Sequence, residues 1–391
     1  MELKAPYRTW AEVDLDRIVH NYNEFKRITT FDGKRPAIMC IVKANAYGHG
    51  AVTVSKRLAQ ENCDMLGVAA FEEALELRRA GIAVPILVLN HIDASCIDEA
   101  LENDITMTVF SKDMARLISE KATGRVKVHV KIDTGLNRVG LKPGEVFEAI
   151  KYIHSLANIE IEGVFTHFAS AASRDGSFTE QQTAHMLKIF EDMQSAGIDI
   201  RFKHAANSAA AIMYPYTLFN MVRIGVSLYG CYTSEEVDKS KIDLKPAMQL
   251  KTQIIRIVDL EPNEPVSYGG LFVTTRPTRL ATIPLGYGDG ISAVLTGKLK
   301  VLINGQLAPV VGKICMDLCM VDITDVTGEV ALNDEVVVYG EQKGAAISVE
   351  QVADLAGTVN DEILCITSMR VPRYYIEGGR IVGKVDFILG V

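Results

Sequence analysis

The chain has 391 residues, of which 48% are hydrophobic and 23% are charged, and its formal net charge is −8. This length and composition exclude intrinsic disorder and a small disulfide-stapled scaffold, and the mild acidity gives no electrostatic footprint for nucleic acid. No apolar signal region opens the sequence and no window approaches the ~18 consecutive apolar residues of a membrane span, so we expect a cytoplasmic protein without a membrane partner.

From about residue 37 to residue 230, short apolar runs alternate with longer segments of helical periodicity. The runs predict eight strands at 37–42, 65–69, 86–89, 106–110, 126–132, 161–165, 202–206 and 222–229. The clearest predicted helices lie at 51–62, 71–81, 111–123, 144–157 and 179–197. Nearly continuous apolar strands that alternate with helices are typical of a parallel sheet buried on both faces. Eight such units favour a (β/α)8 TIM-type barrel over a doubly wound open sheet.

After about residue 242, strands joined by short turns are predicted at 250–258, 278–285, 298–303, 308–311, 320–323 and 335–339. Asn304-Gly305 is a strong signal for a two-residue hairpin. Ser348 and Gln351 form a capping box for one helix, which Gly357 can end. We therefore expect a barrel over residues 1–242 and a mostly antiparallel β domain over residues 243–391, with the first ~12 residues as candidates to pack with the β domain.

Cysteine and histidine spacing predicts no metal site. The seven cysteines are scattered, mostly within apolar runs, and Cys315 and Cys319 have no partner pair of Cys or His nearby. We expect the cysteines to be reduced thiols of the core.

In a barrel, catalytic groups lie at the carboxyl ends of the strands. Five of the eight predicted strand ends supply a polar side chain: Lys43, Arg138, His167, Ser208 and Arg223. Lysine is the residue that forms Schiff bases with carbonyl compounds, although spacing alone fits a surface lysine at position 43 equally well. Ser208 and Gly225 follow the last two strands, where barrels often bind a phosphate. The pattern indicates a ligand pocket.

The motif Val42-Lys43-Ala44-Asn45-Ala46-Tyr47-Gly48-His49-Gly50 resembles the pyridoxal-phosphate (PLP) signature of alanine racemases. The resemblance covers essentially the whole chain. It continues, in order, through Lys131-Ile132-Asp133-Thr134-Gly135 with Arg138, Thr166-His167-Phe168, Ala206-Asn207-Ser208, Arg223-Ile224-Gly225, Val266-Ser267-Tyr268-Gly269, Gly286-Tyr287-Gly288-Asp289-Gly290, Cys315-Met316-Asp317 and Arg370-Val371-Pro372-Arg373-Tyr374-Tyr375.

The resemblance implies a racemase that interconverts L- and D-alanine by two-base proton transfer at the Cα of a PLP external aldimine. Lys43 would hold the cofactor and act as one base. Tyr268, from the other subunit of a homodimer with composite active sites, would act as the second base on the opposite face. His167 would bridge Tyr268 to Arg223, and Arg223 would face the pyridine nitrogen.

The resemblance also implies how the ligands are held. The cofactor phosphate would contact Tyr47, Ser208, Tyr375 and the backbone of Gly225 and Val226. Tyr375 is chosen over its neighbour Tyr374 only because of its spacing from the second arginine of the motif.

On the same basis, Arg138 and the backbone N–H of the partner's Met316 would bind the substrate carboxylate, and Tyr287 would line the entrance. Lys131 stands where family members often have a carbamylated lysine that supports the arginine.

Three other functions remain open. The first is a serine or broad-spectrum racemase of the same fold. The second is a decarboxylase of that fold, which Arg223 argues against because those enzymes present an acidic residue to the pyridine nitrogen. The third is a non-catalytic PLP-binding barrel, and the residues after position 242 count against it.

Overall fold

The computed structural model describes residues 8–390, which divide into two compact units. The barrel unit contains Val19–Ala46 and Ala51–Leu244. The sheet unit contains the segment up to Ile18, the short segment Tyr47–Gly50, and the chain from Lys245 onward. The sheet unit is therefore built from segments that are distant in sequence, whereas the barrel unit is interrupted only by the short segment Tyr47–Gly50.

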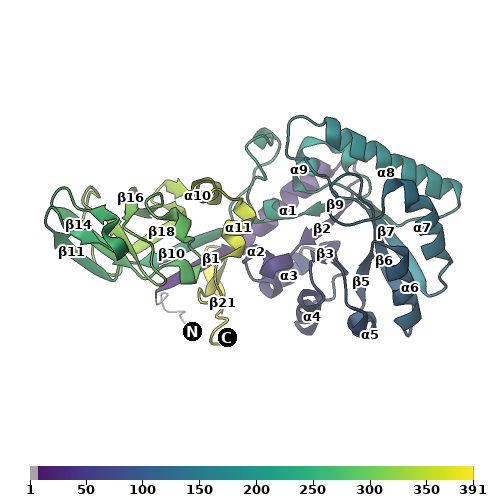
Figure 1. The fold of residues 1–391 in the computed structure, drawn as a ribbon, viewed down its shortest axis with the longest axis horizontal. Coiled ribbons are helices and arrows are strands. Elements are labelled where there is room, and N and C mark those ends of the chain that lie inside the picture. The colour runs from purple at the N-terminus through teal and green to yellow at the C-terminus, as the bar shows by residue number, and fades with distance from the viewer. Residues whose placement is uncertain (1–7, 391) are drawn as a thin grey trace. The chain divides into compact units, whose positions relative to one another are not determined.

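The barrel unit is a closed barrel of eight parallel strands (Figure 1). The strands are β2 (Ala37–Ile41), β3 (Met65–Val68), β4 (Ile86–Val88), β5 (Ile105–Val109), β6 (Val126–Lys131), β7 (Ile159–Phe165), β8 (Phe202–His204) and β9 (Met221–Ile224). Each strand pairs with the next, and β2 pairs in parallel with β9 to close the ring. This closure confirms the predicted barrel and excludes the open sheet, in which the last strand would lie at an edge.

Helices follow the strands and lie outside them in Figure 1. Their bounds are α1 (Leu15–Thr29), α2 (Lys43–Tyr47), α3 (Ala51–Gln60), α4 (Phe71–Arg79), α5 (Ile97–Glu102), α6 (Lys112–Lys121), α7 (Pro143–Ser155), α8 (Ser177–Ser195) and α9 (Ser208–Met213). Helix α6 shows why they form: Ser111 caps it by accepting the N–H of Met114 at 3.1 Å. One face, with Met114, Ala115 and Ile118, is buried.

The sheet unit is mostly antiparallel. Its strands are β1 (Thr9–Asp14), β10 (Met248–Gln253), β11 (Arg256–Leu260), β14 (Thr278–Ile283), β15 (Lys300–Ile303), β16 (Gln306–Val311), β17 (Cys319–Asp322), β18 (Glu335–Gln342), β19 (Ala345–Ile347), β20 (Arg373–Glu377) and β21 (Arg380–Val385). They run in the order β11-β14-β17-β16-β15-β18-β10-β1-β20-β21, with β19 paired to β18. Only the pairing of β1 with β20 is parallel. A separate hairpin joins β12 (Pro265–Val266) and β13 (Phe272–Val273).

Two local predictions for this unit are confirmed. Asn304 and Gly305, with φ of 55° and 73°, turn β15 into β16. Ser348 and Gln351 form the capping box of α10 (Val349–Ala356), which Gly357 ends in the left-handed conformation. A second helix, α11 (Asn360–Cys365), follows.

Two predicted strands are shorter than expected. The run 250–258 is divided between β10 and β11, because the chain leaves one strand pairing and enters another there. The run 222–229 ends as a strand at Ile224, and Val226–Tyr229 forms a 3-10 turn instead. The final strands β20 and β21 were not predicted from the sequence.

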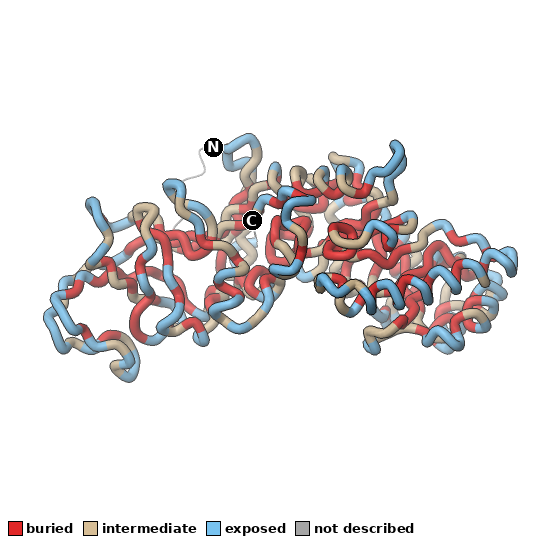
Figure 2. The backbone as a smooth tube through the Cα atoms, turned by 90° about the horizontal axis from the view of Figure 1, so that it is seen from above, coloured by how far each residue is buried: buried red, intermediate tan, exposed pale blue. Residues whose placement is uncertain are grey.

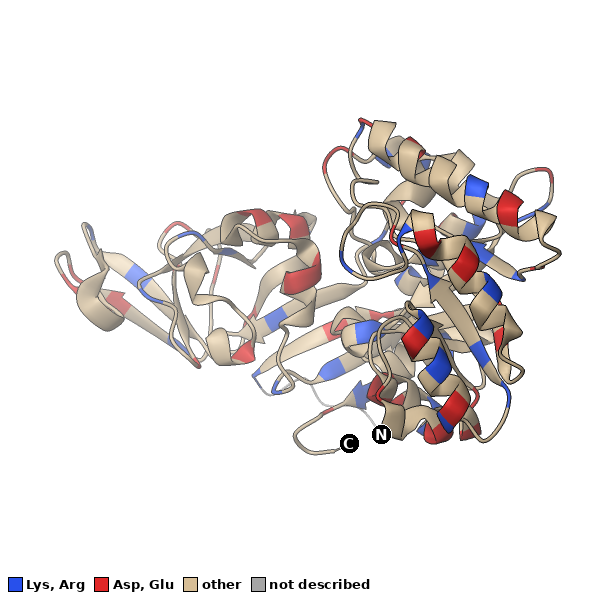
Figure 3. Cartoon of the chain, turned by 45° about the vertical axis from the view of Figure 1, so that its right-hand side comes forward, with Lys and Arg blue, Asp and Glu red and all other residues tan. Residues whose placement is uncertain are grey.

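Burial follows the strands in both units, while the outer helices expose one side (Figure 2). Basic and acidic residues are interspersed along the ribbon (Figure 3). Within residues 8–390, no helix combines the length and the apolar composition that crossing a membrane requires.

Candidate active site

Lys43 follows strand β2 and begins a left-handed turn. Residues 44–47 all have φ between 50° and 54°, a region that L-residues avoid because Cβ approaches the following carbonyl oxygen. Glu73 in α4 stabilises this turn: its carboxylate accepts the N–H of Ala44 at 2.6 Å and that of Ala69 at 2.7 Å. Such strain persists where the surrounding structure enforces it, typically at functional sites. The half-buried Lys43 is therefore set at the strand end by an enforced backbone.

In the sheet unit, Tyr375 on β20 lies against the segment Tyr47–Gly50. Gly50 has a φ of +98°, and the Tyr375 hydroxyl occupies the position that a Cβ at Gly50 would take. The neighbouring Tyr374 points to the other face of the strand, where the Lys384 ammonium lies 5.9 Å from its ring centre. Of the two adjacent tyrosines, Tyr375 is thus the one beside the segment that follows Lys43.

Arg223 on β9 is buried and surrounded by acceptors. Its guanidinium donates to the carbonyl oxygens of Thr166 at 2.8 Å and Ala205 at 3.0 Å. It also donates to Nδ1 of His204 and Nδ1 of His167, each at 3.1 Å. Burial lowers the pKa of Arg223 to about 9, which still leaves the group charged at neutral pH. Within residues 8–390 it forms no ion pair with a carboxylate.

Arg223 also determines the tautomers of both histidines. A guanidinium can only donate hydrogen bonds, so Nδ1 of His167 and of His204 must accept, and each ring carries its proton on Nε2. Burial lowers the pKa of both histidines well below the ordinary value, and the charge of Arg223 lowers it further. Both rings are therefore neutral donors on their Nε2 side.

Lys131, the last residue of β6, is buried beside other cations. Burial, with the charges of Arg223 and Arg138, lowers the pKa of Lys131 to about 7, although Asp133 opposes the shift. Asp133 itself pairs with Lys142 at 3.0 Å. Arg138 is exposed and makes no ion pair with any residue in the described range. The end of β6 therefore offers Arg138 as a cation that can bind an anion, and Lys131 as an amine that is partly neutral near pH 7.

The ends of β8 and β9 are joined through Ser208. Asn207 caps α9 by accepting the N–H of Ala210 at 3.0 Å, which fixes Ser208 as the first helical residue. The N–H of Gly225 donates to Ser208 Oγ at 3.0 Å. Because that oxygen accepts a bond from the protein, the hydroxyl proton of Ser208 is directed elsewhere. Val226 begins the turn that follows Gly225. The Ser208 hydroxyl and the backbone N–H of Val226 thus lie at one point as donors, as phosphate binding requires, while the N–H of Gly225 orients the hydroxyl.

Three predicted residues of the sheet unit are exposed. The relative exposure is 70% for Tyr268, 51% for Met316 and 47% for Tyr287. Tyr268 and Met316 line the same surface groove. Backbone hydrogen bonds join the loop of Tyr287 to the loop of Met316. The N–H of Tyr287 donates to the carbonyl oxygen of Cys315 at 3.0 Å, and the N–H of Gly288 donates to that of Met316 at 2.8 Å. A monomer seldom exposes such side chains together unless another surface covers them.

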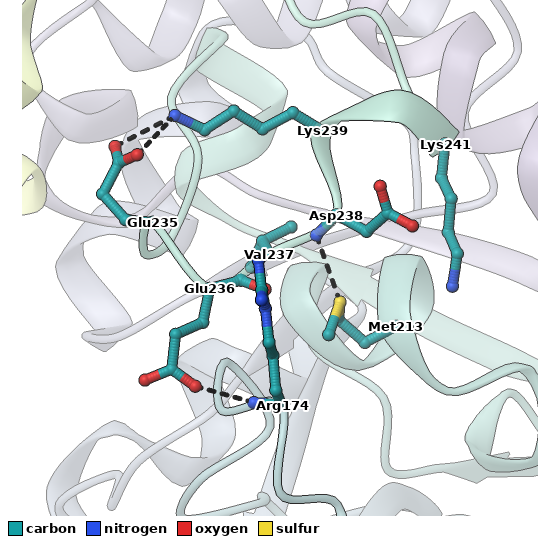
Figure 4. A pocket seen from close by; sticks show the side chains of 8 residues that line it. All are labelled: Arg174, Met213, Glu235, Glu236, Val237, Asp238, Lys239 and Lys241. Carbon is teal, nitrogen blue, oxygen red and sulfur yellow. Dashed lines mark hydrogen bonds and ion pairs between the residues drawn. The ribbon is translucent and has the colours of Figure 1, made fainter.

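A different pocket lies on the barrel unit, around Glu235 and Arg174 (Figure 4). Lys239 pairs with Glu235 at 2.9 Å, and Glu236 accepts the backbone N–H of Arg174 at 2.8 Å. None of the predicted strand-end residues lines this pocket. The strand-end residues therefore remain the candidate site.

Comparison with known proteins gives matches along nearly the whole chain. Residues 13–233 match the model of the alanine racemase N-terminal domain, and residues 247–375 match that of the C-terminal domain. The chain belongs to the alanine racemase family. It is 43% identical over 383 residues to the alanine racemase of Clostridium novyi, which covers 97% of this chain and 98% of the relative.

Solved structures of this racemase family superpose closely. The alanine racemase of Clostridium difficile 630 has a TM-score of 0.93 and 40% identity, covering 98% of this chain and 100% of the other. The alanine racemase of Bacillus anthracis with bound L-Ala-P has a TM-score of 0.91 and 36% identity, covering 99% and 100%. The resemblance and the fold class are thus confirmed. Racemases of this family are PLP-dependent isomerases.

Sequence reasoning missed a buried carboxylate that organises the racemase loops of the sheet unit. Asp289 is fully buried and accepts bonds from Arg8 at 2.8 Å, from Arg370 at 3.0 Å and from the N–H of Gly286 at 3.0 Å. It thereby fixes the loop that presents Tyr287. The signal was an aspartate inside the glycine-rich run at residues 286–290.

Glu73 was also missed. It lies in the first turn of a predicted helix, where an acidic residue is expected for its interaction with the helix dipole. Its bond to the residue after Lys43 depends on two strands coming together, and no local pattern shows that.

Proposed function

We propose that this chain interconverts L- and D-alanine with PLP, as a homodimer whose active sites each use two subunits. Residues 1–242 would supply the cofactor barrel, and residues 243–391 would complete the site of the partner. The observation that supports this most is the convergence of Lys43, Arg138, His167 and Arg223, with the Ser208 cradle, at the carboxyl ends of strands in one closed barrel.

The described residues fit PLP. When bound, PLP supplies the electron sink that makes an amino-acid Cα proton removable. Lys43 is the lysine that would bond to it covalently. Arg223 has a free donor, because its Nε makes no hydrogen bond within residues 8–390, and it would direct that donor to the ring nitrogen. Since the pKa of Arg223 stays at about 9, it donates there without releasing its proton.

The phosphate would be held by neutral donors. Ser208 offers its hydroxyl proton, since its oxygen already accepts the N–H of Gly225, and the backbone of Gly225 and Val226 lies beside it. By the family resemblance, Tyr47 and Tyr375 would add hydroxyl groups. Hydrogen bonds to an anion are among the stronger ones in proteins.

Two bases on opposite faces of Cα explain racemisation. Lys43 Nζ would move the proton on one face, and the hydroxyl oxygen of the partner's Tyr268 would move it on the other. His167 supports Tyr268 because Arg223 occupies its Nδ1, so its Nε2–H is free to donate to the tyrosine oxygen. The 70% exposure of Tyr268 fits a residue that acts in another subunit.

The substrate carboxylate would bind Arg138 and the backbone N–H of the partner's Met316. Arg138 suits this role because no carboxylate among residues 8–390 pairs with it. Carbamylation of Lys131 would place an anion beside Arg138 and hold its guanidinium in position. Tyr287 would line the entrance, on a loop whose backbone is bonded to that of Met316.

A subunit-mixing experiment tests the composite site. Lys43→Ala and Tyr268→Phe are each expected to abolish racemisation, whereas unfolded and refolded mixtures should recover part of the activity, because some dimers contain one intact site. Each variant refolded alone is the control. If mixtures stay inactive although labelled subunits have exchanged, the composite site is wrong.

Substrate and reaction class are tested separately in D2O. With PLP and L-alanine, we expect loss of optical purity and deuterium at Cα, and a much slower reaction with L-serine. Equal rates would favour the broad-spectrum racemase, carbon dioxide release the decarboxylase, and neither exchange nor racemisation a cofactor-binding protein.

A further inference from the structure

A chain of buried polar side chains lies behind Arg223 in the barrel. Arg223 donates to Nδ1 of His204 at 3.1 Å, and Nε2 of His204 lies 2.8 Å from Nδ1 of His129. Nε2 of His129 in turn lies 3.5 Å from Glu162 Oε2, which is an ion-pair distance without hydrogen-bond geometry. Each of the four residues comes from a different strand, and both histidine rings are fully buried. A buried polar chain of this kind requires a reason beyond packing.

The local backbone is shaped around the ring of His129. The pairing of β6 with β7 shifts register between Val128 and His129, which places Gly163 opposite His129. A Cβ at Gly163 would come 2.5 Å from Nδ1 of His129. Phe165 then stacks on His204 with ring centres 4.7 Å apart and planes 3° from parallel. Bulges that redirect a side chain are common beside active sites.

The donors in this chain can point in only one direction. Arg223 must donate, so His204 accepts on Nδ1 and donates from Nε2. His129 therefore accepts on Nδ1 and carries its own proton on Nε2, directed at Glu162. The hydrogen bonds from Arg223 to His204 and from His204 to His129 run in one direction, and Nε2 of His129 then faces the carboxylate at 3.5 Å. Any other tautomer would set two protons or two lone pairs against each other.

The carboxylate at the far end is ionised. Burial alone would raise the pKa of Glu162, but His129 and the charges of Arg201 and Lys127 lower it. Arg201 donates to Glu162 at 3.1 Å and is 71% exposed. The chain thus extends from buried Arg223 to a solvent-facing ion pair just before β8.

We propose that Glu162 and His129 are positioning residues for Arg223. They give the buried guanidinium an anion through two neutral imidazoles, and they fix its orientation toward the cofactor ring. This inference rests on the proposed role of Arg223, and nothing in it requires Glu162 or His129 to touch a ligand. It accounts for a buried cation that has no carboxylate beside it.

The groups around the two rings support neutral tautomers. His129 faces Glu162 on one side, with His204 and Arg223 on the other, and burial is the largest cause of its lowered pKa. His204 faces His129, Arg223 and Lys131, and burial again lowers its pKa most.

The tautomers can be read directly by nitrogen NMR. In wild-type protein labelled with ¹⁵N-histidine, with and without PLP, His129 and His204 should each show a protonated Nε2 and an unprotonated Nδ1 at every pH from about 6 to 9. Signals are assigned from the single variants His129→Gln and His204→Gln. A proton on Nδ1 of either ring, or an imidazolium in this range, would overturn the proposal whatever the activity.

Glu162→Gln keeps an acceptor near His129 but removes the charge. We expect mixed tautomers at His129 in the PLP-free protein, and a kcat for L-alanine lower by about tenfold with KM changed less than about twofold. Glu160→Gln is the matched control, because Glu160 lies on the same strand and pairs only with Arg125 at the surface. Unchanged tautomers or a wild-type kcat in Glu162→Gln would refute the positioning role. The wild-type spectrum remains decisive if the variant does not fold.

Discussion

Lys131 should bind carbon dioxide reversibly, and the structure explains the pH at which it does so. Only a neutral amine attacks carbon dioxide, and an ordinary lysine is almost entirely protonated at pH 7. Burial of Lys131 next to Arg223 and Arg138 disfavours the ammonium ion. The resulting carbamate is an anion, so the same two arginines that destabilise the ammonium stabilise the product.

The lowered pKa of Lys131 sets the fraction of the side chain that can react. The pKa of Lys131 is lowered from 10.5 to about 7. At pH 7 about half of the side chain is therefore neutral, against roughly three molecules in 10,000 for an unshifted lysine. The reactive fraction is thus larger by roughly a thousandfold, and it approaches completion by about pH 8.

¹³C NMR in labelled bicarbonate measures the modification. We expect one carbamate resonance whose intensity rises through about pH 7 and disappears on acidification, because the protonated carbamate loses carbon dioxide. Lys131→Gln should remove it. Lys127→Gln should not, since Lys127 is an exposed lysine of the same strand, paired with Asp104. A wild-type protein with no carbamate at pH 8 in saturating bicarbonate would refute the reasoning.

Three further changes test other parts of the site. Gly50→Ala should lower the free energy of unfolding, measured by urea titration, by about 1–3 kcal/mol. The new methyl group would meet the Tyr375 hydroxyl, and the φ at this position is strained for alanine. Adding Tyr375→Phe to this variant should recover part of the loss. Tyr375→Phe alone should weaken PLP affinity about tenfold in a fluorescence titration, whereas Tyr374→Phe should not, and equal effects would contradict the assignment. Asp289→Asn should cost about 1–3 kcal/mol, since two partly exposed arginines lose a fully buried anion, and an unchanged melting temperature would disprove that role.

The barrel was predictable because each of its elements has a local signal. Strands such as 37–42 are continuous apolar runs, and helices such as 111–123 have caps and a single apolar face. Closure was predicted only from the count of eight units, since no local pattern shows the pairing of Ile38 with Val222. The strands β1 and β20 were missed because Ala11 pairs with Arg373 across almost the whole chain. The strand β21 was missed although it forms a local hairpin with β20.

Some residues of the candidate site were likewise predictable from the sequence, and others were not. Strand-end reasoning found Lys43, Arg138 and Arg223 because catalytic groups of barrels lie at those positions. It could not find His129 or Glu162, which stand inside strands and look like ordinary alternating residues. Their connection appears only when β6, β7 and β8 are adjacent and Gly163 makes room for the ring.

The excess of positive charge at the barrel end explains why the proposed ligands are anions. Lys131, Arg138 and Arg223 lie close enough for their charges to interact, and Asp133 is already paired with Lys142. Between about pH 7 and 10.5 the unfolded chain binds more protons at Lys131 than the folded chain does, so this residue makes the fold more stable as the pH rises through that range. The cations at this end of the barrel repel one another. A phosphate, a substrate carboxylate or a carbamate that binds only the folded state reduces this repulsion and so stabilises the fold. The cations thus lower the stability of the empty barrel and, for the same electrostatic reason, select ligands that carry negative charge.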